Sequence, residues 1–321
     1  MNTICVSVII VNYRSAELVI NCVNSIYEKT KDISFEIIVV DNASGDTSVV
    51  KLREALKERA KIVESDQNLG FGKANNLGNK YAHGEYIFLL NPDTILVNNA
   101  IKILYDELVR YPDYGVVGGN LFMPDMSPAP SYCMWFDDIE SEKKRASWKK
   151  LIGDKVLEKL GLNKEIPFKN EFNRSGEPLK VAYIFGADMM MKKSVFDEIK
   201  GFDPDFFMYA EEEELTWRIT EKGYQIMNIP DAQIIHLEGA TSKRQNEFSE
   251  RQFRMRMNGA MTYYRKRFGT DGLHRFYQYR KLRYERLIQI AKVQHKLTDH
   301  FLPLIQKKCL EEEYKHYITK L

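Results

Sequence analysis

Two stretches decide the fold, VSVIIVNYRS (residues 6–15) and EIIVVDNASGD (residues 36–46). Each begins with a run of β-branched apolar residues and ends in polar ones. Such a run is typical of a strand buried on both faces, as in a parallel sheet. Helical patterns follow at about 16–28 and 47–59, so strands and helices alternate along the chain. The sequence therefore predicts an α/β fold, Rossmann-like, with a mostly parallel central sheet flanked by helices.

Polar residues follow directly after the predicted strands. Ligands of open α/β sheets bind at these carboxyl ends. Asp93, after the strand at 86–90, could hold a hard divalent cation, although a Pro-Asp turn explains it equally. Asp41 could accept an N–H of a bound base, or close an Asx turn. The run Asn68-Leu69-Gly70-Phe71-Gly72 could bring backbone N–H groups to a phosphate at a helix start.

The alternation is interrupted between residues 120 and 180, where Pro124, Pro128 and Pro130 precede a charged stretch. We interpret 120–180 as an inserted, partly helical segment over the acceptor side of the site. Helix and strand patterns return from 181 onward. The predicted organisation is a catalytic α/β domain at 1–242 and a basic, aromatic helical extension at 243–321.

An acidic run, Glu211–Glu214, opens a predicted helix after an aromatic stretch. Acids at a helix N-terminus are stabilised by the helix dipole, which is the simplest explanation. Four in succession also repel one another, so one of them could have a raised pKa and act as a general base. His236 ends the last predicted strand and is either a core histidine or a metal ligand beside carboxylates.

Charge is distributed unevenly along the 321 residues. The 47 Lys and Arg nearly balance the 45 Asp and Glu, which argues against a dedicated nucleic-acid binder. However, residues 243–296 have a net charge of +11 and residues 1–242 a net charge of −9. A basic, aromatic helix could rest on an anionic membrane surface. The alternatives are a helix that packs on the acidic body and a homodimer contact.

Cysteine usage and hydropathy suggest the compartment. The four cysteines are scattered and form no CxxC pair, which suits a reducing cytoplasm. No signal peptide is recognisable, and no apolar run approaches the roughly 20 residues that span a bilayer. We expect a cytoplasmic protein, peripheral on the inner face of the membrane if the basic segment docks there.

The combination of motifs is more specific than any one of them. The chain resembles the family 2 glycosyltransferases, which have a GT-A fold, and within them bacterial dTDP-rhamnosyltransferases. The resemblance covers about 6–125 and 181–270. Beyond the two opening stretches it rests on NLGFGKANNLG (68–78), YIFLLNPDT (86–94), FGADMMMKKSVFDEIKGFDPDFFMYAEEEELTWRI (185–219), GY (223–224) and IIHLEG (234–239).

The resemblance implies roles for particular residues. Asn91-Pro92-Asp93 matches the DxD metal motif with Asn91 in place of its first acid, so Asp93 would contact Mg²⁺ or Mn²⁺, with His236 nearby. Glu212, preceded by Glu211, matches the general base. The donor-binding positions would line the nucleotide and its diphosphate, with Asp41 on the base; they are Asn12, Tyr13, Asp41, Asn68, Gly70, Lys73, Asn91, Trp217 and Arg218.

The function implied by the resemblance is an inverting, single-displacement sugar transfer to a hydroxyl of a polysaccharide or a lipid-diphosphate-linked glycan. The first expectation for the donor is dTDP-rhamnose, and the alternative is a UDP- or GDP-sugar. A non-catalytic nucleotide-sugar-binding or scaffold protein is an alternative of another class, against which Glu212 and Asp93 argue. A nucleotidyltransferase would have a Gly-rich basic loop where this chain has Asn12-Tyr13-Arg14-Ser15. We expect no nucleic-acid partner.

Overall fold

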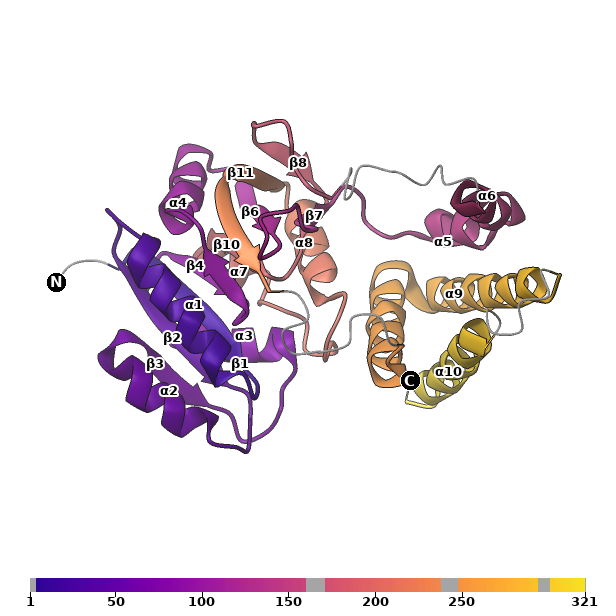
Figure 1. Cartoon of the computed structure of the whole chain (residues 1–321), viewed down its shortest axis with the longest axis horizontal. Helices are drawn as coiled ribbons and strands as arrows, with labels where there is room; N and C mark the ends of the chain where they lie inside the picture. Colours follow the sequence, from indigo (N-terminus) through magenta and orange to yellow (C-terminus); the bar gives the residue numbers. More distant parts are fainter. Residues whose placement is uncertain (1–3, 160–170, 238–247, 294–300, 321) are drawn as a thin grey trace. The chain divides into compact units, whose positions relative to one another are not determined.

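The structure, a computed structural model, describes residues 4–159, 171–237, 248–293 and 301–320. The chain forms two compact units (Figure 1). Residues 120–180, expected as one insertion, are divided between them. The first unit comprises Met1–Phe136, Pro167–Phe207 and Glu211–Gln245; the second comprises Asp137–Ile166, Met208–Ala210 and Asn246–Leu321.

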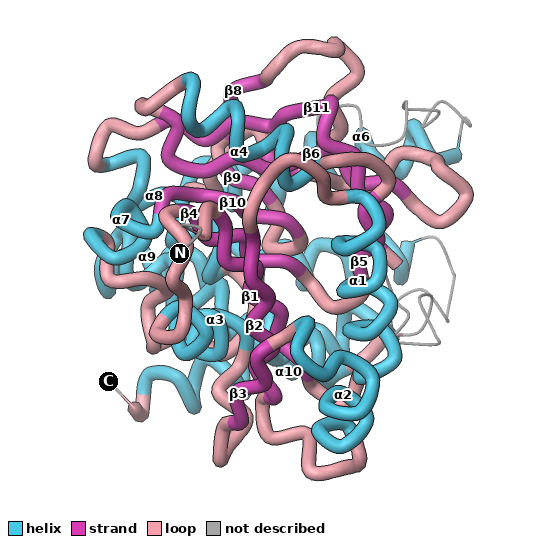
Figure 2. The backbone as a smooth tube through the Cα atoms, turned by 90° about the vertical axis from the view of Figure 1, so that its left-hand side faces the viewer, coloured by secondary structure: helices cyan, strands magenta, loops and turns pink. Residues whose placement is uncertain are grey.

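The first unit is built on a mixed sheet that has nine strands within the described residues. Figure 2 shows these strands following one another from β3 at one end to β11 and β8 at the other. The first four strands are parallel, as predicted, and the next one, β10, is antiparallel to both of its neighbours. The order is β3 (Lys61–Glu64), β2 (Phe35–Asp41), β1 (Val6–Asn12), β4 (Tyr86–Leu90), β10 (Asp188–Lys192), β6 (Tyr114–Phe122), β11 (Gln225–His236) and β5 (Thr94–Leu96), with β8 (Leu179–Val181) beside β11.

Helices cover both faces of this sheet because strand residues alternate between two apolar cores. Val8 and Ile10 of β1 belong to one core, and Ile9 belongs to the other. The first core includes side chains of α1 (Ala16–Lys29), α2 (Ser48–Leu56) and α4 (Ala100–Arg110), and the 3₁₀ turn η1 (Lys57–Arg59) follows α2. The second core includes side chains of α3 (Phe71–Asn79), α7 (Lys193–Glu198) and α8 (Glu211–Glu221).

Strand register brings the polar strand ends together. β1 and β2 pair in parallel register up to Asn12 opposite Asp41. On the other side of β1, Ile10 lies opposite Leu90, the last residue of β4. The polar residues after β1, β2 and β4 therefore meet at one edge, as the sequence predicts. A two-stranded sheet, β7 (Tyr132–Cys133) with β9 (Tyr183–Ile184), precedes β10.

The second unit is helical. It contains α5 (Ile139–Ala146), α6 (Trp148–Lys159), α9 (Glu250–Val293) and α10 (Phe301–Ile318). Gly269 interrupts α9 with a positive φ of 69°, so α9 is two helices joined at a kink, visible in Figure 1. No described helix is long and apolar enough to cross a membrane.

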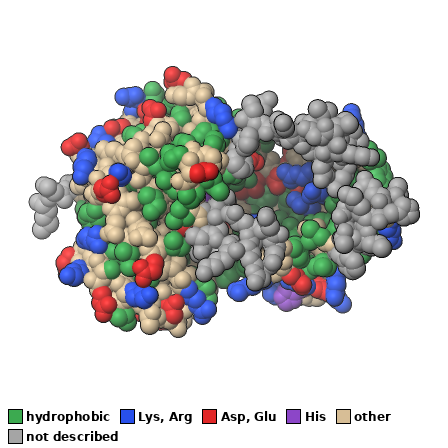
Figure 3. Space-filling model, in the orientation of Figure 1, with side chains coloured by type: hydrophobic (Ala, Val, Ile, Leu, Met, Phe, Trp, Pro, Cys, Tyr) green, Lys and Arg blue, Asp and Glu red, His purple; other side chains and the backbone are tan. Residues whose placement is uncertain are grey.

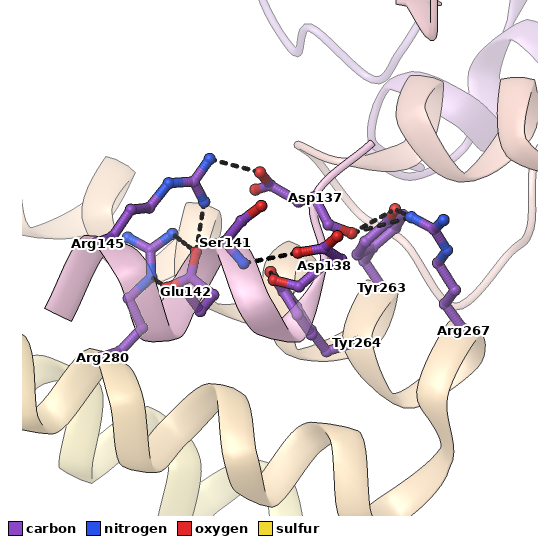
Figure 4. Close-up of polar contacts among 9 residues, drawn as sticks. All are labelled: Asp137, Asp138, Ser141, Glu142, Arg145, Tyr263, Tyr264, Arg267 and Arg280. Atoms are coloured by element: carbon purple, nitrogen blue, oxygen red, sulfur yellow. Dashed lines mark hydrogen bonds and ion pairs between the residues drawn. The ribbon is translucent and has the colours of Figure 1, made fainter. Parts of the chain in front are cut away.

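Most of the described basic side chains of α9 have partners within the second unit. Figure 4 shows Arg280 and Arg145 around the buried Glu142 of α5. Arg254 pairs with Glu250, Glu312 and Glu313. These contacts favour a packing role for the basic segment, with α5 and α10 as its partners; Lys243 and Arg244 lie outside the described residues.

Charge on the visible face of the first unit is mixed. In Figure 3, Lys and Arg side chains are interspersed with Asp and Glu over this face. The net charge of −9 over residues 1–242 is therefore not gathered into one acidic patch on this face.

Candidate active site

A buried polar cluster joins the ends of β1 and β2. Asn12 donates from Nδ2 to Asp41 Oδ1 at 2.6 Å and to Ser44 Oγ at 3.1 Å. Asp41, only 3% exposed, also accepts from the Ser44 backbone N–H and hydroxyl. Asp41 therefore holds the loop after β2 in place, and its predicted contact with a donor base would have to exchange with these internal hydrogen bonds.

Asn42 connects this cluster to the loop before α3. Its Nδ2 donates to Asn68 Oδ1 and to the Gly70 carbonyl, both at 3.1 Å, and its Oδ1 accepts from the Leu69 N–H at 2.8 Å. Asn68 Oδ1 in turn accepts from the Gly70 N–H. The predicted diphosphate loop is thus fixed to the end of β2 by buried and partly buried hydrogen bonds.

Gly70 is confined from its other side by Phe207. Its φ is +79°, and a Cβ placed on it would lie 1.9 Å from the Phe207 carbonyl oxygen. The same oxygen accepts from the Phe71 N–H at 3.1 Å. Only glycine fits here, and the loop before α3 is bonded to the segment that leads toward α8.

Tyr13 and Lys73 are the predicted donor residues that remain available to a ligand. Tyr13 is 40% exposed, and the Arg14 guanidinium lies 5.2 Å from its ring centre. Lys73 lies in the first turn of α3, and within the described residues it has no hydrogen bond or ion pair. An exposed aromatic ring and an unpaired lysine suit a base and a diphosphate, respectively.

Asp93 and His236 lie side by side because β5 pairs with β11. The register places His236 opposite Thr94, and His236 Nε2 is 3.3 Å from Asp93 Oδ1. Both side chains are mostly buried. The Leu237 N–H also donates to the Asp93 carbonyl. The sequence singled out both residues, and the structure brings them together; Glu238 and Gly239 of the same motif lie outside the described residues.

This pair fits a divalent cation as part of its ligand set. It offers one carboxylate oxygen and one imidazole nitrogen. The described residues contain no group of three or more His, Cys, Asp and Glu side chains arranged to hold a metal ion. Ions in nucleotide sites commonly take one or two protein ligands and complete their shell with phosphate oxygens and water. Asp93 and His236 meet that requirement.

Glu212 lies near the same edge, across from the turn between β9 and β10. A Cβ placed on Gly186 of this turn would lie 4.0 Å from Glu212 Cβ. The next residue, Ala187, accepts a hydrogen bond of 2.9 Å from the Asn91 N–H. The Asn91–Asp93 turn and Glu212 are therefore joined through two adjacent residues, Gly186 and Ala187.

The first two acids of α8 are held in an unusual electrostatic state. Burial raises the pKa of Glu212. Burial, with a contribution from the charge of Glu212, raises the pKa of Glu211 well above its ordinary value. Glu211 is 3% exposed, and its Oε2 has no hydrogen-bond partner among the described residues. Burial therefore favours the neutral form of both carboxyl groups, and the charge of Glu212 adds to this effect at Glu211.

Arg218 and Trp217 are placed differently from the other donor candidates. The Arg218 guanidinium forms a bidentate pair with Glu214, at 2.7 Å for each N···O distance. It also donates to the carbonyls of Ile199 and Gly201. Arg218 therefore supports the turn after α7, and Trp217 lies beside it on the later turns of α8, away from Glu211 and Glu212 along the helix.

Sequence reasoning missed three polar side chains that organise this edge. Asn42 and Ser44 follow β2 but were not assigned a role. Asn76 of α3 exchanges two hydrogen bonds with the backbone of Phe202, at 2.8 and 2.9 Å. The sequence did contain a feature that could have indicated them: Asn42 and Ser44 come directly after a strand, and Asn76 lies within the 68–78 motif.

Two glycosyltransferases are similar to this chain in sequence. Glycosyltransferase GlyG of Streptococcus pneumoniae is 31% identical over 129 residues, which cover 40% of this chain and 42% of GlyG. The N-acetylglucosaminyl-diphospho-decaprenol L-rhamnosyltransferase of Mycobacterium tuberculosis (strain H37Rv) is 24% identical over 226 residues, 65% of this chain and 68% of that protein.

The fold also has solved counterparts. The structure of GalNAc-T7 with UDP, GalNAc and Mn²⁺ aligns with a TM-score of 0.60 at 16% identity, over 99% of this chain and 58% of that chain. The predicted GT-A fold is thereby confirmed. The sequence profile described as glycosyl transferase family 2 matches residues 7–200, most of the first unit and more than half of the chain. With the polar strand ends, the Asp93–His236 pair and the acids of α8 in the order that the motifs predict, the chain belongs to glycosyl transferase family 2.

Proposed function

We propose that the chain is an inverting glycosyltransferase that moves a sugar from a nucleoside diphosphate to a hydroxyl of a glycan or a lipid-linked glycan. One observation supports this most: the hydrogen bond from Asn91 to Ala187 joins the Asp93 turn to the turn that faces Glu212. A carboxylate suited to proton removal and a pair suited to a metal thus lie on two sides of one small region.

The proposed reaction is a single displacement. Glu212 accepts the proton of the acceptor hydroxyl as its oxygen attacks the anomeric carbon. The new C–O bond forms while the bond from that carbon to the diphosphate oxygen breaks, and the nucleoside diphosphate leaves with the electron pair. A base on the face opposite the leaving group gives inversion without a covalent intermediate. The raised pKa of Glu212 makes it a stronger base than an ordinary carboxylate.

Asp93 and His236 would hold Mg²⁺ or Mn²⁺ in this scheme. When bound, the ion supplies Lewis-acid stabilisation of the charge that grows on the leaving diphosphate. Lys73 adds a fixed positive charge at the start of α3, where backbone N–H groups also favour an anion. GalNAc-T7 was solved with Mn²⁺, which supports a divalent ion at this fold's donor site.

For the donor we propose dTDP-rhamnose. The NLGFGKANNLG and LLNPDT motifs support this choice, and so does the similarity to a protein named as an L-rhamnosyltransferase. That name also includes an N-acetylglucosaminyl-diphospho-lipid, so we propose a lipid-diphosphate-linked acceptor of this kind. UDP- and GDP-sugars are the alternative donors.

The test is a donor panel with Mn²⁺ present, measured by thermal unfolding and then by transfer. A ligand that binds the folded state raises the melting temperature by mass action. We expect dTDP-rhamnose to raise it more than UDP- or GDP-sugars and to support transfer to an N-acetylglucosaminyl diphosphate with a short lipid. A larger shift with a UDP- or GDP-sugar would reassign the donor. Donor binding without hydrolysis or transfer would favour the non-catalytic alternative.

A further inference from the structure

Three aromatic side chains of the first unit are in ring contact beside the small β7–β9 sheet, and a fourth, Trp135, is adjacent to them in sequence. Phe136 stacks on Tyr183 with ring centres 6.3 Å apart and planes inclined by 24°. Tyr183 meets Phe185 edge to face at 5.7 Å. Trp135 precedes Phe136 just beyond β7. We call Trp135, Phe136, Tyr183 and Phe185 the aromatic strip.

The aromatic strip ends at the proposed catalytic base. Phe185 is followed by Gly186, and a Cβ on Gly186 would lie 4.0 Å from Glu212 Cβ. The Phe71 ring lies 3.4 Å from the same Cβ position and encloses the turn from the other side. One end of the strip is therefore next to the Cβ of Glu212.

One member of the strip, Trp135, is unusually exposed for so large an apolar side chain. Trp135 is 67% exposed, the largest exposed fraction among the exposed large apolar side chains described. Its three companions are half-buried. Trp side chains are highly buried on average, and this exposed indole beside three half-buried rings offers an apolar surface on which a ligand can stack.

The order of strands separates this strip from the donor loops. β4 lies between β1 and β10 in the sheet. The loops after β1 and β2, with Tyr13 and Asp41, are on one side of the Asp93 turn, whereas β9 and Gly186 lead into β10 on the other side. In a single displacement, the attacking hydroxyl and the leaving diphosphate are on opposite sides of the reacting carbon. The strip is therefore on the side that the acceptor must occupy.

We propose that the aromatic strip is the subsite for the acceptor sugar. The proposal rests on the proposed function, because it takes Glu212 as the base. Pyranose rings present a face of C–H groups, and aromatic rings attract such groups through their negative faces. The four strip residues carry no carboxylate and no cationic group, so the subsite suits a neutral sugar ring, with its attacking hydroxyl directed at Glu212.

The experiment compares Trp135→Ala and Trp135→Phe with the matched control Trp148→Ala, an exposed tryptophan of the second unit. The acceptor probe is N-acetylglucosaminyl diphosphate carrying a farnesyl chain, and hydrolysis of the donor by water is measured separately. We expect Trp135→Ala to raise the acceptor KM by about three- to tenfold, with Trp135→Phe intermediate. Donor KM and donor hydrolysis should stay at the wild-type value in all three variants.

The acceptor subsite and the transferase activity can be tested separately. If donor hydrolysis is normal and Trp135→Ala leaves the acceptor KM unchanged, the subsite is wrong while the transferase assignment stands. A Trp135→Ala protein with an altered donor KM would also overturn it, because the strip would then serve the donor. If the wild-type protein neither transfers a sugar from any nucleotide-sugar to the acceptor probe nor hydrolyses one, the proposed function is wrong, and the subsite proposal fails with it.

Discussion

Two buried glutamates, each in the first turn of its helix, have opposite surroundings. Glu142 of α5 is 1% exposed, and its carboxylate lies 2.6 Å from Arg145 Nη1 and 2.5 Å from Arg280 Nε. Glu211 of α8 is 3% exposed and lies beside another acid, with one oxygen unpaired.

The difference shows two uses of a buried carboxyl group: it can hold helices together, or it can have a raised pKa that suits proton transfer. An ion that is paired on two sides fixes helices to one another, and removing one partner leaves an uncompensated charge. A carboxylate beside a second carboxylate, with few donors, is held at a cost to stability and with a raised pKa. A raised pKa of this kind suits the proposed role of the neighbouring Glu212, which is to take up a proton.

Glu212→Gln tests the chemical side of the comparison and has the largest expected effect. An amide of the same shape cannot accept the proton, so transfer should fall by roughly 10² to 10⁴-fold. Donor binding, measured by thermal shift, should persist. Glu211→Gln is the matched control and should keep most of the activity, since the raised pKa of Glu211 favours its neutral form, which glutamine resembles. Near-normal turnover in Glu212→Gln would remove Glu212 from the mechanism.

Arg280→Met tests the structural side. It leaves Glu142 with Arg145 alone in a buried position, and breaking such a pair costs about 3 to 5 kcal/mol of unfolding free energy. Lys281→Met removes a neighbouring, more exposed pair with Glu311 and should cost less than about 1 kcal/mol. Equal losses in the two variants, measured by urea unfolding, would contradict the distinction between buried and exposed pairs.

Asn42→Ala extends the comparison to the first unit. Unlike Glu211, Asn42 is a buried polar residue whose amide oxygen and nitrogen both have hydrogen-bond partners. Its loss leaves the Leu69 N–H unpaired, at a cost of about 1 to 3 kcal/mol. Since the loop it holds is the proposed diphosphate loop, donor KM should rise more than kcat falls. The exposed Asn24→Ala is the control. A change in kcat alone would assign Asn42 a different role.

Glu211→Gln should also change the pH dependence of the melting temperature, by a smaller amount than the effects above. The pKa of Glu211 is raised in the folded state, so its stabilising contribution is complete below the unfolded pKa and is lost as pH rises through the folded pKa. The wild-type melting temperature should therefore fall relative to that of Glu211→Gln as pH increases from acidic to neutral and beyond. Parallel curves would indicate that Glu211 is not perturbed.

The sequence predicted the first unit better than the second for a physical reason. The strands at 6–12, 35–41 and 86–90 are specified by local apolar runs, and their polar ends meet because parallel register requires it. The proximity of Asp93 and His236 has another cause, the antiparallel pairing of β5 with β11, and the sequence indicated it only through the family motifs. The sequence could not predict that Asn42 would bind the 68–70 loop, because side-chain pairing between loops depends on their full path.

The second unit depends on pairs that are far apart in sequence. Glu142 and Arg280 are 138 positions apart. A basic helix has the same composition whether it faces solvent, a membrane or buried acids, so composition alone left these alternatives open. The kink at Gly269 was also not predicted, because the pattern of residues on both sides of it is helical.

The contact between Gly70 and Phe207 limits how the chain can be re-engineered. Exchanging residues 68–79 for those of another transferase, to change the donor, would also exchange one side of the hydrogen bond from Phe71 to Phe207 and of the pair between Asn76 and Phe202. The receiving segment, 201–207, is shaped to its present partner by close backbone approach. The smallest transplantable module for donor choice is therefore discontinuous, two segments more than 120 positions apart that have to be replaced together.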